Sequence, residues 1–136
     1  MDDVIVYPTV GDVLAIHEAV VASDHGTEAG VRSPETVESA LIYVSEGYFG
    51  EAPDTIHETA AHLMRLLAAE HPFVDGNKRT ALNATALFYD LNDHEFRYDN
   101  GVRRILRQFA TDESAADIAA VVTYCRTNAV PTGGEA

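Results

Sequence analysis

The chain has few of the features that mark secreted or membrane proteins. Its 136 residues include one cysteine, Cys125, so no disulfide can form within the chain, and a reducing cytoplasm is expected. A membrane-spanning helix needs about 20 consecutive apolar residues, and no stretch of the sequence comes near that length. The opening residues MDDVIVYPT lack the basic region of a secretory signal. We predict one cytoplasmic domain at 1–128 and a frayed tail at 129–136.

Lysine is almost absent as well. Lys78 is the only one, and the other eight of the nine basic residues are arginine, against 22 acidic residues and a formal net charge of −13. Such a surface repels the phosphates of nucleic acids and of anionic lipids, so neither a nucleic acid nor a membrane is expected as a direct partner. Abundant carboxylates with arginine in place of lysine resemble the composition of haloarchaeal proteins, where dissolved salt screens the repulsion.

Apolar residues recur at helical spacing in two long segments, 54–70 and 78–93. Both place apolar side chains at i, i+4 and i+7, which is typical of a helix that faces the core. The sequence therefore predicts two long helices joined by a short polar loop. The first would bury Ile56, Ala60, Leu63 and Leu67, and the second Ala81, Ala84, Leu87, Phe88 and Leu91.

Capping residues mark further helices. One is expected to begin at Ser33, which is followed by proline, and to end before Gly47. Another is expected to begin at Thr9 or Asp12. The predicted fold class is all-α, a compact bundle of about six helices around the central pair. Two more helices are predicted at 101–110 and 114–128, and short extended pieces at 4–7 and 94–98.

The loop between the two long helices reads HPFVDGNKRT, residues 71–80. Its last residues begin the second helix, where free N–H groups and the helix dipole favour an anion. Lys78 and Arg79 place positive charge in this first turn, which is unfavourable unless a polyanion is bound there. We interpret Gly76, Asn77, Lys78 and Arg79 as a phosphate-binding site. The alternative is that Lys78 and Arg79 only form ion pairs with neighbouring carboxylates.

The same loop carries groups suited to phosphate chemistry. Asp75 offers the hard oxygen ligand that Mg²⁺ takes from proteins together with phosphate oxygens. His71 is a candidate general base, while Phe73 is assigned to packing. These residues predict phosphoryl or nucleotidyl transfer.

Two other metal and phosphate motifs are excluded by spacing. A P-loop needs G-x-x-x-x-G-K-[ST] after a strand, whereas here Asn77 separates glycine from lysine and a helix precedes them. His57 and His62 are five residues apart, about 140° around a helix, so they cannot form the i, i+4 zinc pair. They are assigned to the surface or to packing, as are His17, His25 and His94.

HPFVDGNKRTA resembles the signature of the Fic/Doc superfamily, H-P-F-x-[DE]-G-N-[GK]-R. GVRSPETVESAL at 30–41 is also similar to its Doc (death-on-curing) branch, so the resemblance covers roughly residues 7–110. It implies a small all-helical toxin of a toxin–antitoxin module, with an antitoxin protein as partner. It further implies that His71 deprotonates a target hydroxyl, that Asp75 holds Mg²⁺, and that residues 76–79 bind the phosphates of ATP.

Two positions depart from the AMP-transferring branch of the superfamily. Lys78 stands where those members have glycine, and Leu82 stands where they have a second arginine. Both departures fit the Doc branch, for which the resemblance implies transfer of the γ-phosphoryl group to a Ser/Thr hydroxyl of a translation elongation factor. The alternatives are AMP transfer to a protein hydroxyl and, from another class, a non-catalytic binding module of a toxin–antitoxin complex.

The resemblance also implies a flap that positions the target, at Gly47, Tyr48, Phe49 and Gly50; the alternative is an ordinary connector. The inhibitory helix of some Fic proteins, [ST]-x-x-x-E-[GN], is not matched by IYVSEG at 42–47, so an intramolecular lock is not expected. Arg32 is interpreted as a structural tether.

Overall fold

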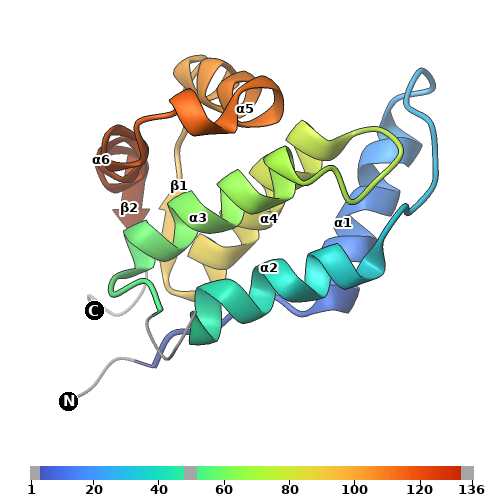
Figure 1. The fold of residues 1–136 in the computed structure, drawn as a ribbon. Coiled ribbons are helices and arrows are strands. Elements are labelled where there is room, and N and C mark those ends of the chain that lie inside the picture. The colour runs from blue at the N-terminus through green and yellow to red at the C-terminus, as the bar shows by residue number, and fades with distance from the viewer. Residues whose placement is uncertain (1–3, 48–51, 133–136) are drawn as a thin grey trace.

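The computed structural model describes residues 4–47 and 52–132, and within them the chain forms six α-helices and one two-stranded antiparallel sheet (Figure 1). The predicted all-α class is confirmed. None of the described helices is both long and apolar enough to cross a membrane. The elements are α1 (Val10–Ser23), α2 (Pro34–Glu46), α3 (Ile56–Ala69), α4 (Asn77–Leu91), β1 (His94–Phe96), α5 (Gly101–Thr111), the short 3₁₀ helix η1 (Glu113–Ala115), α6 (Ile118–Asn128) and β2 (Ala129–Pro131).

Helices α3 and α4 form the centre of the molecule (Figure 1). Helices α1 and α2 cover one side of this pair, and α5 and α6 cover the other. The central helices bury several alanines completely, which lets their backbones approach closely, while larger side chains fill the space beside them. The fully buried alanines are Ala60, Ala61, Ala68, Ala81 and Ala84, and the large buried side chains include Leu63, Met64, Phe73, Phe88 and Tyr89.

The helix starts follow the capping signals of the sequence. Thr9 and Asp12, which the sequence offered as alternatives, act together: each side chain accepts a hydrogen bond from the main-chain N–H of the other, a capping box. Ser33 caps α2 as predicted, and Gly47 follows its last residue with a φ of 73°. These caps fix where α1 and α2 begin.

The predicted strand at 4–7 is wrong. The N–H and carbonyl groups of Val6 pair with the side-chain amide of Asn92, at 2.9 and 2.8 Å, in place of a second strand. A single amide satisfies the main chain of one residue only, so no strand forms there.

The C-terminal segments differ from the prediction in two ways. Helix α6 begins four residues later than expected, because the Asp117 side chain caps it by accepting the N–H of Ala120. Residues 129–131, predicted to be frayed, form β2, which pairs with β1. The predicted extended piece at 94–98 is confirmed as β1 over three residues.

Close packing of the central pair predicts that α4 tolerates no larger side chain at a buried alanine. Ala84→Leu should lower the free energy of unfolding by about 1–3 kcal/mol, because Ala84 is fully buried. Asn83→Leu, which adds the same side chain at the exposed neighbouring position, should change it by about 0.5 kcal/mol or less. Chemical denaturation of both variants checks this. Equal losses would show that close α3–α4 packing is not what limits position 84.

Candidate active site

The loop between α3 and α4 and the first turn of α4 surround a cavity of about 300 Å³. Every residue that the sequence proposed for the catalytic, metal and phosphate roles lines this cavity. Some of these residues lie in the loop and the others in the first turn of α4. Val74, which sequence analysis did not select, also contributes a wall. The lining residues are His71, Val74, Asp75, Gly76, Asn77, Lys78 and Arg79.

Gly76 makes the sharp bend between loop and helix. Its φ of 78° and ψ of 19° lie in the left-handed region, and a Cβ there would stand 3.2 Å from Val20 Cγ1 and 3.3 Å from Thr27 Cγ2. Both the conformation and the space therefore favour glycine. The bend leaves the N–H groups of residues 77–79 at the free start of α4, where an anion is favoured.

Asn77 ties the loop to the helix. Its side-chain Oδ1 accepts the Phe73 N–H and its Nδ2 donates to the Phe73 carbonyl, both at 3.0 Å. The sequence interpretation placed Asn77 among the phosphate-binding residues, whereas the structure commits its side-chain amide to the loop. Any contact of Asn77 with an anion would come from its main-chain N–H.

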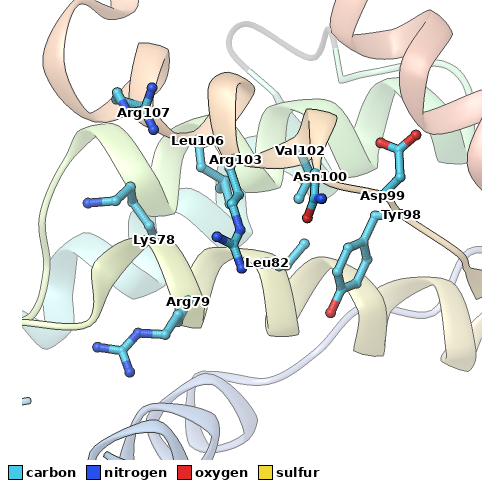
Figure 2. A pocket seen from close by; sticks show the side chains of 10 residues that line it. All are labelled: Lys78, Arg79, Leu82, Tyr98, Asp99, Asn100, Val102, Arg103, Leu106 and Arg107. Carbon is cyan, nitrogen blue, oxygen red and sulfur yellow. The ribbon is translucent and has the colours of Figure 1, made fainter.

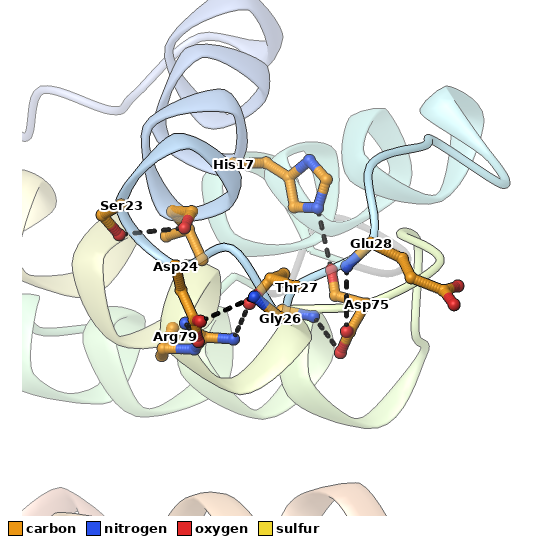
Figure 3. Close-up of polar contacts among 10 residues, drawn as sticks. His17, Ser23, Asp24, Gly26, Thr27, Glu28, Asp75 and Arg79 are labelled. Atoms are coloured by element: carbon orange, nitrogen blue, oxygen red, sulfur yellow. Dashed lines mark hydrogen bonds and ion pairs between the residues drawn. The ribbon is translucent and has the colours of Figure 1, made fainter.

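The two cations of the motif differ in their surroundings. Arg79 forms an ion pair with Asp24 at 3.0 Å and donates to the Thr27 hydroxyl at 2.5 Å (Figure 3). Lys78 is exposed, and among the described residues no carboxylate oxygen lies within 4.0 Å of its ammonium group. The ion-pair alternative therefore holds for Arg79 but not for Lys78, which has no ion-pair partner among the described residues.

The Asp75 carboxylate is held by two main-chain N–H groups, with Oδ2 accepting from Glu28 at 3.1 Å and Oδ1 from Gly76 at 2.8 Å (Figure 3). These hydrogen bonds, that of Glu28 foremost, hold the pKa of the carboxyl below its usual value, so it stays ionised at neutral pH. Each oxygen keeps a second lone pair, and the described residues offer no cluster of three metal-ligating side chains. Such a donor fits Mg²⁺ that takes its other ligands from phosphate and water.

His71 is oriented by a contact with helix α5. Its Nε2 lies 3.2 Å from the carbonyl oxygen of Ala110 in α5. A carbonyl only accepts, so Nε2 carries a proton, and in the neutral ring the lone pair is on Nδ1. His71 also has a φ of 50°, an uncommon conformation for a residue other than glycine.

The connection between α1 and α2 binds the main chain of the loop along its length. The N–H groups of Arg32 and Ser33 donate to the Pro72 carbonyl at 2.8 and 3.1 Å, and the Val74 N–H donates to the Gly30 carbonyl at 3.0 Å. The predicted tether at Arg32 thus acts through its main-chain N–H. His17, assigned to packing by sequence analysis, also contacts this loop through the Asp75 carbonyl.

A second cavity, of about 630 Å³, lies between α4 on one side and α5 with the preceding residues 98–100 on the other (Figure 2). It shares Lys78 and Arg79 with the first, and Arg103 and Arg107 bring the number of cations to four of the nine in the chain. Neither of these arginines has a carboxylate within 4.0 Å among the described residues. The other lining residues are Leu82, Tyr98, Asp99, Asn100, Val102 and Leu106.

Of the predicted flap, only Gly47 lies in the described part of the chain, where it ends α2. Tyr48, Phe49 and Gly50 lie outside the described residues.

Comparisons with known proteins agree with the motif. A family model described as Fic/DOC family matches residues 7–89. The chain is also 31% identical over 111 residues to a protein named Toxin Doc from Mycolicibacterium smegmatis, a match that covers 75% of this chain and 85% of that protein.

The double hydrogen bond of Asn77 predicts a stability cost that its neighbour does not share. Asn77→Ala leaves the N–H and carbonyl of Phe73 without their partner and should lower the free energy of unfolding by about 1–3 kcal/mol. Asn83→Ala makes the same chemical change on the exposed face of α4 and should cost less than about 0.5 kcal/mol. Urea denaturation distinguishes them, and a harmless Asn77→Ala would mean that the amide does not hold the loop.

Proposed function

This chain belongs to the Fic/DOC family, and from that premise we propose that it is a Doc-like toxin with protein kinase activity. It would transfer the γ-phosphoryl group of ATP to a Ser/Thr hydroxyl of a translation elongation factor and so block protein synthesis. The observation that carries the proposal is the shared cavity. Lys78, without an acidic partner among the described residues, lines it with His71 and the start of α4.

The start of α4 is the proposed binding site of the transferred phosphate. Main-chain N–H groups of residues 77–79 supply donors that need no reorganisation when the ligand arrives, and Lys78 adds a mobile positive charge. Arg79 is held by Asp24, so it orients the turn and contributes its field from a fixed position. In phosphoryl transfer most of the catalysis comes from such positioning and charge stabilisation.

His71 is the proposed general base. Because Nε2 donates to the Ala110 carbonyl, Nδ1 is the atom that can take the proton of the target hydroxyl. The hydroxyl oxygen then forms a bond to the γ-phosphorus, the bond from that phosphorus to the bridging oxygen breaks, and ADP leaves. The proton ends on Nδ1 and passes to solvent.

Asp75 is the proposed Mg²⁺ ligand, through the lone pairs that the Glu28 and Gly76 N–H groups do not use. Bound Mg²⁺ would neutralise charge on the phosphate chain. Asp75 itself contributes an anchored, ionised carboxylate at the edge of the cavity, and its two hydrogen bonds restrict the direction in which its oxygens can point.

The remainder of the nucleotide is proposed to extend into the larger cavity. The smaller cavity, of about 300 Å³, is at the low end of ligand-pocket volumes, and the larger one shares Lys78 and Arg79 with it. Arg103 points into that space beside Leu82 (Figure 2). Leu82 gives the larger cavity an apolar wall where the AMP-transferring branch has an arginine, which supports γ-phosphoryl transfer over AMP transfer.

An antitoxin protein is the proposed partner, by similarity to the family. A different class of function, a non-catalytic binding module, would use the same cavities without chemistry. Both alternatives to the kinase are outcomes of the following experiment.

Label transfer to the elongation factor separates the three functions. With γ-labelled ATP the target should become labelled, and with α-labelled ATP it should not. His71→Ala should reduce the rate by about 10²–10⁴-fold, because the hydroxyl loses its base, and should abolish growth inhibition. Label from the α position would establish AMP transfer, and growth inhibition that survives His71→Ala would establish a binding function.

The larger cavity predicts a charge-reversal effect at one arginine of α5 and not at the next. Arg103→Glu should raise the KM for ATP about tenfold, which corresponds to about 1.4 kcal/mol, because the side chain faces the proposed nucleotide. Arg104→Glu makes the same change beside a different hollow, near Ile105 and Gln108, and should leave KM within about twofold. Equal effects of the two variants would remove the nucleotide from this cavity.

A further inference from the structure

His17 stands against the loop that carries the proposed Mg²⁺ ligand, although it belongs to α1. It lies on the inward stripe of that helix with Val13 and Val20, and only 3% of its surface is exposed. A buried imidazole needs a hydrogen-bond partner, and Nε2 finds one in the Asp75 carbonyl oxygen at 2.8 Å (Figure 3). Since a carbonyl only accepts, Nε2 carries the proton.

A stacking contact also fixes the orientation of the His17 ring plane. It stacks on the ring of Phe73, with the centroids 3.9 Å apart and the planes 7° from parallel. Phe73 is itself fully buried and is held by the side-chain amide of Asn77. The stack and the hydrogen bond therefore define both the position and the direction of Nε2.

The Asp75 carbonyl and the Gly76 N–H belong to the same planar peptide unit. On one side of this unit the carbonyl accepts from His17, and on the other side the N–H donates to Asp75 Oδ1 at 2.8 Å. If the unit rotated, the carbonyl oxygen would turn toward the carboxylate and repel it. Glycine at position 76 makes such a rotation accessible, because glycine adopts positive and negative φ with similar ease.

We propose that His17 is a positioning residue that locks the Asp75–Gly76 peptide, and through it the Asp75 carboxylate, in the orientation that presents a divalent cation with a fixed oxygen. The hydrogen bond to His17 counters the freedom that Gly76 brings to this peptide. The proposal goes beyond the general need for a packed core, because it assigns a directional role to one ring nitrogen. Its ligand-binding part rests on the proposed function.

Two substitutions separate the hydrogen bond from the packing. His17→Phe keeps an aromatic ring against Phe73 and removes the donor, whereas His17→Gln restores a donor near the place of Nε2. Val13→Ala, one turn earlier on the same buried stripe, is the matched control, because Val13 is fully buried and has no polar group to offer the loop. All variants are made in the His71→Ala background, so that no turnover interferes.

Titration calorimetry of the full chain with ADP, at fixed Mg²⁺ and without it, provides the first readout. In His17→Phe the gain in ADP affinity that Mg²⁺ provides should fall about ten- to a hundredfold, as for other residues that orient a metal ligand. His17→Gln should recover most of it, and Val13→Ala should keep it while unfolding at lower denaturant. An unchanged gain in folded His17→Phe, or the same loss in Val13→Ala, would overturn the proposal.

Amide exchange supplies a second readout that does not depend on any ligand. In the ligand-free protein the Gly76 N–H should exchange with solvent at least about tenfold faster in His17→Phe than in the parent or in His17→Gln, because the unlocked peptide opens more often.

If His17→Phe does not fold, the parent alone decides: its His17 Nε2 proton should be visible by NMR and protected. Faster exchange at Gly76 without any ADP binding in the parent would leave the lock standing and contradict the proposed function. Equal exchange, or an unprotected Nε2 proton in the parent, would contradict the lock itself.

Discussion

The main-chain pairing between the α1–α2 connection and the loop at 71–76 is the interaction on which the rest of the site depends. An irregular loop loses roughly 1–2 kcal/mol of conformational entropy for each residue it fixes. Here that cost is offset by main-chain hydrogen bonds from Ser33 and Arg32 to Pro72 and from Val74 to Gly30, and by the bond from the Glu28 N–H to the Asp75 carboxylate. The N–H groups at the start of α4 are consequently held in place before any ligand arrives, which is the condition for electrostatic catalysis by fixed dipoles.

The two cations of the motif, Lys78 and Arg79, also suit the binding of an anion. A cation without an ion-pair partner is unfavourable at a helix start, and a bound anion reverses that cost. In the structure one cation of the motif has an ion-pair partner and the other has none among the described residues. Arg79 supports the turn by pairing with Asp24, while Lys78 lines both cavities and shares the larger one with Arg103 and Arg107. The cationic lining of the larger cavity is where a small polyanion is favoured.

The sequence alone predicted the parts that depend on local rules. Periodicity placed α3 and α4, capping residues placed α1 and α2, and the motif placed the loop between the long helices. It did not predict the parts that depend on where side chains and distant segments point. The pairing of β2 with β1 joins segments about 35 residues apart, the Asn77 amide could face either the loop or an anion, and nothing in the spacing of α1 distinguishes His17 from an ordinary packing residue.

The central claim is that the start of α4 binds the phosphates of a nucleotide, and the amide resonances of residues 76–79 test it most directly. Titration of the isotopically labelled full chain with Mg²⁺ and a non-hydrolysable ATP analogue should shift the free amides of residues 77–79 most, with Gly76 and the residues of the larger cavity following at the same apparent affinity. If those amides stay unchanged at saturation while shifts gather elsewhere, the start of α4 is not the phosphate site and the account is contradicted.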